Sequence, residues 1–172
     1  LVHAEDPSLA IGMEMFERAF QSPRDAVVPV RSDEAVMLEQ TEWQERWSID
    51  VALYRPILEL ARREHLPIVA LNARRELTRT IAREGEAALP EELRAELPAD
   101  MDRADAEHRE MVLALLGGHA HGEGGMSPET LERFYLAQLV WDETMGETVA
   151  PCGAGRTGTS TAWLNPPARS VS

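Results

Sequence analysis

Two short runs of apolar residues stand out along the chain, at residues 9–16 and 66–72. The first follows Asp6-Pro7-Ser8, the second contains Pro67, and each leads into a charged stretch with helical spacing. Apolar runs of this length on both sides of helices are typical of parallel strands buried on both faces. The pattern therefore predicts two neighbouring parallel strands, at about residues 9–14 and 67–71, in an α/β fold.

Each predicted strand ends by presenting a polar side chain, Glu14 in the first and Asn72 in the second. Ligands of open parallel sheets gather at the carboxyl ends of the strands. Glu14 and Asn72 are therefore candidate site residues. The alternative is that both side chains only cap neighbouring backbone groups.

The stretches around these strands carry the three-and-four spacing of helices. The strongest stripe runs over residues 43–65 and predicts a helix in which Pro56 marks either a kink or a restart. Gly85 is a predicted helix stop, Gly117-Gly118 is a second, and Ser127 is a predicted N-cap. The other predicted helices cover 17–28 (broken), 33–42, 74–84, the stretch from Pro90, 102–116 and 131–149. Residues 119–126 are a predicted loop, and residues 151–172 are predicted to be a disordered tail without a strand.

Composition narrows the classes of function. The 172-residue chain has a formal net charge of −13, which argues against nucleic acid or anionic lipid as the main partner. All 17 basic residues are arginine, a planar donor suited to carboxylates. A single cysteine, Cys152, excludes an intramolecular disulfide framework, and no apolar run is long enough for a transmembrane helix.

Four collinear segments between Ser8 and Ala150 resemble the ChaN-like haem-binding family. The segments are Ile11–Phe16, Trp43–Arg62, Leu66–Arg74 and Phe134–Met145. The resemblance implies an iron-regulated bacterial lipoprotein or secreted protein, periplasmic or anchored at the outer membrane, whose leader is not in this chain. It implies haem as cofactor, held between two protomers and ligated by a tyrosine, with an outer-membrane haem receptor as partner. It also implies a parallel sheet flanked by helices, with a smaller helical subdomain at about 86–130 inside a domain spanning 1–150.

The chain departs from the family pattern at both ends. The family carries a Gly-Glu-x-His element on an early strand and a Gly-His element on a late one. Neither element is present here, and His3 has no Gly-Glu before it. We therefore expect an incomplete sheet and a chain truncated at both ends, which would self-associate through its exposed strand edges.

Haem requires an apolar slot, an axial donor and cations for its propionates. Tyr135 and, second, Tyr54 are the candidate phenolate ligands, each with a plain core role as the alternative. His119 and His121 are candidate second donors or residues of a solvated loop, and His65 and His108 are expected at the surface. Arg74 and Arg75 are candidate propionate partners or members of a solvated helix face.

The leading interpretation is a protein that binds haem in bacterial iron uptake, as a homodimer and without catalysis. The alternative is a hydrolase similar to the erythromycin esterase-like class, in which Glu14 would be a catalytic or metal-binding carboxylate. A third interpretation is a fragment with no retained activity.

Overall fold

The computed structural model describes residues 9–21, 33–47, 49–120, 126–154 and 162–164. The chain forms two compact units. Unit 1 comprises Leu1–Asn72 together with Thr148–Ser172, and unit 2 comprises Ala73–Glu147. Unit 1 holds the sheet, and unit 2 is built from helices and contains the range 86–130 for which the sequence predicts a helical subdomain.

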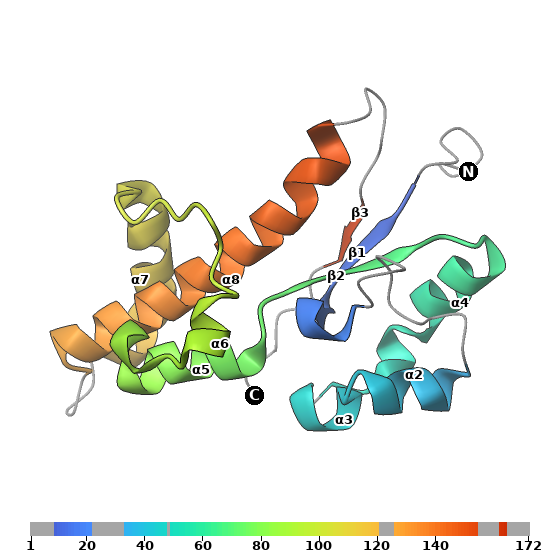
Figure 1. Cartoon of the computed structure of the whole chain (residues 1–172), viewed down its shortest axis with the longest axis horizontal. Coiled ribbons are helices and arrows are strands. Elements are labelled where there is room, and N and C mark those ends of the chain that lie inside the picture. Colours follow the sequence, from blue (N-terminus) through green and yellow to red (C-terminus); the bar gives the residue numbers. More distant parts are fainter. Residues whose placement is uncertain (1–8, 22–32, 48, 121–125, 155–161, 165–172) are drawn as a thin grey trace. The chain divides into compact units, whose positions relative to one another are not determined.

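The sheet of unit 1 has three parallel strands in the order β2-β1-β3 (Figure 1). They are β1 (Ile11–Glu17), β2 (Ile68–Asn72) and β3 (Ala162–Leu164). Ile11 is opposite Ile68 and Met13 is opposite Ala70, which confirms the predicted parallel pair and the α/β class. At Gly12 a Cβ atom would lie 3.0 Å from Leu71 Cδ1, so the absence of a side chain permits this close approach.

Unit 1 contains short helices where the sequence predicts a long one. They are η1 (Arg18–Phe20), α2 (Glu34–Gln40), α3 (Trp43–Arg46), η2 (Val51–Leu53) and α4 (Arg55–Arg63). An unbroken helix over 43–65 is therefore wrong, whereas the alternative of a restart at Pro56 is confirmed by α4, which begins at Arg55. Trp47 is extended, the Asp50 carboxylate accepts a hydrogen bond from Ala52 N at 2.9 Å and starts a new turn, and Pro56 lies in the first turn of α4 rather than at a kink.

The aromatic side chains of unit 1 converge on Trp43, which is fully buried. The Trp43 ring lies 5.6 Å from the Phe16 ring and 5.7 Å from the Tyr54 ring, edge to face in the second contact. Such contacts add to the apolar burial that holds the unit together.

A buried ion pair fixes the end of β1. Glu17 is only 3% exposed, and its carboxylate accepts two hydrogen bonds from Arg46 Nη1, at 3.0 and 2.9 Å. Arg46 Nε also donates to Glu42 Oε2 at 2.8 Å, and its guanidinium lies 4.7 Å from the centre of the Phe20 ring. The predicted broken helix over 17–28 is wrong at its start, because Glu17 ends a strand; residues 22–32 lie outside the described part.

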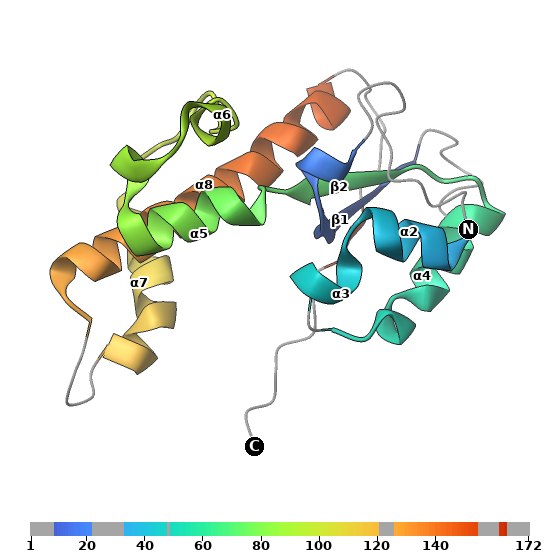
Figure 2. The same cartoon turned by 60° about the horizontal axis from the view of Figure 1, so that its bottom comes forward.

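Unit 2 consists of α5 (Arg75–Glu84), η3 (Glu86–Ala88), α6 (Glu91–Arg94), α7 (Ala106–Ala120) and the part of α8 (Pro128–Ala154) that precedes Thr148 (Figure 2). Gly85 ends α5 with a φ of +91°, as predicted, because a glycine has no Cβ to oppose a positive φ. Ser127 Oγ accepts a hydrogen bond from Thr130 N at 3.1 Å and caps α8, also as predicted.

Two predictions for the C-terminal half need correction. Helix α7 starts at Ala106 rather than 102 and runs through Gly117-Gly118 to Ala120, so these glycines do not end it. Helix α8 continues past Pro151 to Ala154, and residues 162–164 form a strand beside β1, so the tail is not free of regular structure. The rest of the tail, 155–161 and 165–172, lies outside the described residues.

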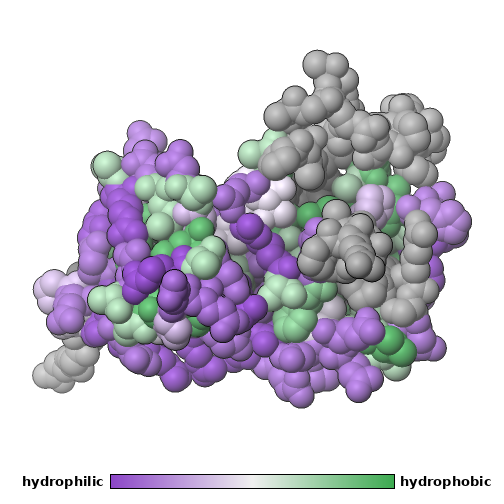
Figure 3. Space-filling model, in the orientation of Figure 1, coloured by the Kyte–Doolittle hydropathy of each residue, from purple (hydrophilic) through white to green (hydrophobic). Residues whose placement is uncertain are grey.

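Hydrophilic residues cover most of the described surface on the face shown in Figure 3, and hydrophobic residues form separate patches there. This distribution agrees with the composition, because the chain has 30 acidic and 17 basic residues to cover its surface. No helix in the described part of the chain is long and apolar enough to cross a membrane.

Candidate functional site

The structure brings Glu14 and Asn72 together, but through the backbone of Glu14. Asn72 Nδ2 donates to the Glu14 carbonyl oxygen at 3.0 Å across β1 and β2. Glu14 lies in the middle of β1 and is half-buried, so the prediction that it ends the strand is wrong. Asn72 does end β2, is 4% exposed, and its Oδ1 has no partner among the described residues.

Tyr54 is a core residue of unit 1 with one unsatisfied polar atom. It is 4% exposed, and its buried hydroxyl has no hydrogen-bond partner in the described structure. Burial raises the pKa of the phenol, and the negative charge of Glu14 raises it further. Burial and the charge of Glu14 therefore both disfavour the phenolate form of Tyr54.

Tyr135 on α8 is the other buried tyrosine, at 2% exposure, and its hydroxyl is also without a described partner. Burial raises the pKa of this phenol too. Arg109 opposes this rise, because its guanidinium lies 4.5 Å from the centre of the Tyr135 ring and lowers the pKa of the phenol. The acids Asp105, Glu132 and Asp102 raise the pKa by smaller amounts. Unlike Tyr54, Tyr135 has a cation beside it.

His108, which the sequence predicts at the surface, instead lies beside Tyr135 and forms a cluster with Tyr135, Gln138 and Asp142. His108 on α7 lies with its ring centre 5.8 Å from the Tyr135 ring, and its Nε2 is 3.0 Å from Asp142 Oδ2. Gln138 Nε2 donates to the other oxygen of Asp142 at 3.0 Å. His108 has a side-chain exposure of 17%, so the surface assignment is wrong for it, whereas His65 is exposed as expected.

The remaining sequence candidates are not part of this cluster. Arg74 forms ion pairs with Glu96 at 3.0 Å and Glu92 at 3.5 Å. His119 lies in helix α7 rather than in the predicted loop; its side chain, like the whole of His121, lies outside the described residues. Among the residues that are described, no three of His, Cys, Asp and Glu gather closely enough to hold a bare metal ion.

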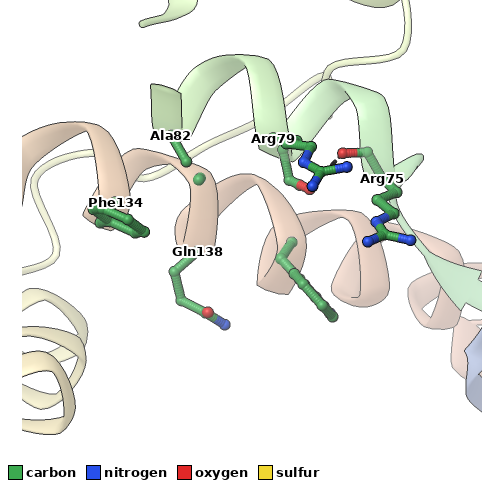
Figure 4. A pocket seen from close by; sticks show the side chains of 8 residues that line it. Arg75, Arg79, Ala82, Phe134 and Gln138 are labelled. Carbon is green, nitrogen blue, oxygen red and sulfur yellow. Dashed lines mark hydrogen bonds between the residues drawn. The ribbon is translucent and has the colours of Figure 1, made fainter. Parts of the chain in front are cut away.

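A groove lies between α5 and α8 within unit 2. Its volume is about 250 Å³. Figure 4 shows Arg75 and Arg79 on α5 and Phe134 and Gln138 on α8. The rest of the lining is formed by Thr78, Ala82, Ala137 and Trp141. The sequence analysis names Arg75 but misses the rest of the groove. The signal it could have used is the shared helical face of Phe134, Gln138 and Trp141.

Unit 2 combines three kinds of group that can serve in haem binding. These are a buried phenol without a hydrogen-bond partner among the described residues, aromatic rings beside an open groove, and arginines that suit carboxylates.

Comparison with known families agrees with that chemistry. Residues 1–164 match the family described as "Haem-binding uptake, Tiki superfamily, ChaN". The chain therefore belongs to the ChaN haem-binding family, as its sequence motifs predict. Comparisons with curated proteins and with solved structures give no match.

Proposed function

We propose that the protein binds ferric haem for bacterial iron uptake and performs no catalysis on it, with the phenolate of Tyr135 as the iron ligand. The observation that carries this proposal is the buried hydroxyl of Tyr135, which has no hydrogen-bond partner among the described residues and belongs to a ring that faces the Arg109 guanidinium. When bound, haem supplies a ferric iron, a Lewis acid that accepts an anionic oxygen donor. An unpaired buried hydroxyl has no protein hydrogen bond to give up in that exchange.

Charge supports Tyr135 over Tyr54. Arg109 lies over the Tyr135 ring and favours the charged form of the phenol, whereas Glu14 adds a negative charge near Tyr54. Each ring makes an aromatic contact, Tyr54 with Trp43 and Tyr135 with His108, so ring packing does not separate the two candidates. Tyr135 is 2% exposed, so ligation requires the contact between α7 and α8 to open at its ring.

The proposal includes haem held at a homodimer interface. The groove of about 250 Å³ is smaller than the roughly 300–1,000 Å³ of pockets that enclose a small ligand. A second protomer would cover the part of the haem that one groove leaves open. The proposal also includes a periplasmic or outer-membrane location and exchange of haem with an outer-membrane receptor, and the role in uptake that the family description names supports both.

Two conservative variants test the iron ligand. Tyr135→Phe keeps the ring against His108 and removes only the hydroxyl, so it should fold normally and lose the tyrosinate charge-transfer band of the ferric haem complex. Tyr54→Phe makes the same chemical change in unit 1 and is the matched control, which should keep the band. Haem titrations followed in the Soret and visible regions provide the measurement.

Each other result has a definite meaning. If Tyr54→Phe alone abolishes the band, the ligand is Tyr54. If both variants keep the wild-type spectrum, neither phenol ligates iron. If the wild-type protein gives no Soret shift on titration, the haem-binding proposal itself is wrong.

A further inference from the structure

Helix α7 is attached to the rest of unit 2 by few buried side chains. Of its described side chains, those of residues 106–115, only Val112 is buried, whereas Met111 is 56% and Leu115 is 77% exposed. The shorter helix α5 buries three of its ten residues. Elements with few buried apolar contacts open locally at a small cost in free energy. We therefore expect α7 to open more readily than α5.

The start of α7, in contrast, is anchored. Asp105 Oδ1 accepts hydrogen bonds from Glu107 N at 3.0 Å and from His108 N at 2.9 Å, and so caps the first turn. Just before it in the chain, Asp102 N donates to Glu143 Oε1 on α8 at 3.3 Å. These bonds involve backbone groups at or before the first turn, so they can persist while the later turns of α7 move. An anchored start followed by a weakly packed helix is the arrangement of a hinged lid.

Arg109 joins α7 to α8 directly above a buried ring. Its guanidinium lies 4.5 Å from the centre of the Tyr135 ring, and both of its Nη atoms donate to the Glu132 carboxylate on α8. The side chains of Arg109 and Glu132 are 39% and 54% exposed, so water competes for both and the pair holds the helices together only weakly. The contact of His108 with Asp142 adds a second polar link between the two helices.

The surface that α7 covers on α8 contains Tyr135 (Figures 1 and 2). Val112 packs with Tyr135 and Leu139 in a small cluster, which is distinct from the cluster in which α5 packs on α8. Movement of α7 would therefore uncover Tyr135 and leave the contact between α5 and α8 in place. The Tyr135 hydroxyl has no hydrogen-bond partner among the described residues, so exposure to water would lower its free energy.

We propose that α7 is a hinged lid over Tyr135 and that Arg109 is the residue that holds this lid closed. The inference deepens the proposed function, on which it rests for its purpose, because it names how a ligand reaches the phenol. The opening itself is a property of the chain without any ligand, so it is tested without haem.

Hydrogen exchange of the full chain, followed by mass spectrometry, tests the lid. In the wild type the amides of α7 should exchange at least about tenfold faster than those of α5. Arg109→Gln should raise the exchange rate of α7 by about fivefold to tenfold and leave that of α5 unchanged, because it removes both the ring contact and the ion pair. Nitration of Tyr135 by tetranitromethane should rise by a similar factor, whereas nitration of Tyr54 in unit 1 should not change.

Two glutamates in the first turns of α8 give a matched pair of variants. Glu132→Gln breaks the pair with Arg109 and should raise the exchange rate of α7 by about twofold. Glu129→Gln removes the same charge, but its partner Arg133 is on α8 itself, so the exchange rate of α7 should not change measurably. Charge alone cannot produce the expected rise in nitration. The reagent attacks the phenolate, and Arg109→Gln removes a cation that lowers the pKa of Tyr135.

Several outcomes would overturn the inference. These are equal exchange rates of α7 and α5 in the wild type, an unchanged α7 in Arg109→Gln, an equal rise in α5, or equal effects of Glu129→Gln and Glu132→Gln. If α7 exchanges as slowly as α5 while ferric haem shows the tyrosinate band, the lid is wrong and the proposed function stands. If the lid opens as expected but haem gives no Soret shift, the proposed function is wrong and the lid stands.

Discussion

The two units use charged side chains in opposite ways. In unit 1 the Glu17 carboxylate is buried and held by Arg46, whose side chain is itself only 13% exposed. In unit 2 the ion pairs lie nearer the surface, as for Arg103, which is half-exposed where it meets Glu86. Unit 2 also has two arginines in an open groove. Buried charges must be paired to be tolerated, whereas exposed charges are stabilised by water, so unit 1 depends more strongly on its ion pair than unit 2 does on the Arg103–Glu86 pair.

The two tyrosines sharpen the same contrast. Both phenols are buried and both hydroxyls are unpaired in the described structure. They differ in the charged group that contributes most, which is the acid Glu14 at Tyr54 and the cation Arg109 at Tyr135, where nearby acids oppose it. Burial alone therefore does not distinguish the two phenols, whereas their charged neighbours do.

The largest expected effect comes from breaking the buried pair of unit 1. Arg46→Met would leave Glu17 buried without its main partner, and we expect the free energy of unfolding to fall by about 3–5 kcal/mol. Arg55→Met is the control in the same unit, because the Arg55–Glu34 pair is exposed and its loss should cost at most about 1 kcal/mol. Urea unfolding followed by circular dichroism gives both values.

A second substitution tests the cause of that loss. If an unpaired buried charge is responsible, Glu17→Gln combined with Arg46→Met should recover part of the stability. Equal losses for Arg46→Met and Arg55→Met would break the contrast between the units, because the Glu17 pair would then behave as a surface pair.

The sequence could predict the centre of unit 1 because its signals are local. The apolar runs of β1 and β2 need no knowledge of distant residues, and their parallel pairing follows from the helices between them. A continuous helix over 43–65 failed because the apolar spacing hides the break after Arg46, whereas Pro56 marks the restart at α4. Asp50 is a visible N-cap signal, and its hydrogen bond to Ala52 N outweighs the continuous stripe.

The candidate site was predictable only in part. Tyr135 and Arg75 could be named from residue type and position, as could the approach of Asn72 to β1. The contact between His108 and Asp142 spans 34 residues and depends on how α7 packs on α8, which residue spacing does not encode. The groove likewise exists only once α5 lies beside α8.

A smaller effect should separate the two tyrosines at high pH. The folded pKa of each phenol is raised above its unfolded value, so the stability that each neutral phenol contributes is present below pH about 10 and is lost as the pH rises. Glu14 adds to the rise at Tyr54, whereas Arg109 opposes it at Tyr135. Between pH about 9 and 11, Tyr54→Phe should therefore gain more stability relative to the wild type than Tyr135→Phe does.

The chain suits this measurement because it has two tyrosines and no lysine, so few other side chains titrate in that range. At neutral pH both Phe variants should match the wild type or exceed it by up to about 1 kcal/mol, since each removes an unpaired buried hydroxyl. Thermal unfolding at a series of pH values tests the order, and near-ultraviolet phenolate absorbance identifies the titrating group. A larger gain in stability for Tyr135→Phe would show that the pKa of Tyr135 is raised more than that of Tyr54, which would contradict the effects inferred for Arg109 and Glu14.

The smallest expected effect lies in the surface pairs of unit 2. Arg103 donates from Nη1 and Nη2 to the two carboxylate oxygens of Glu86, both at 2.9 Å, and this pairing lowers the pKa of Glu86. A lowered folded pKa stabilises the protein above the unfolded value of about 4.3, and that stability is lost as the pH falls through the folded pKa. Glu86→Gln should therefore lower the free energy of unfolding by about 0.2–1 kcal/mol at pH about 7 and should not change it at strongly acidic pH.

Glu84→Gln is the control, because it removes the same charge from an exposed position and should lower the free energy of unfolding by less. A loss at neutral pH as large as that of Arg46→Met would mean that unit 2 also depends on a buried pair, and the division of roles between the units would not hold.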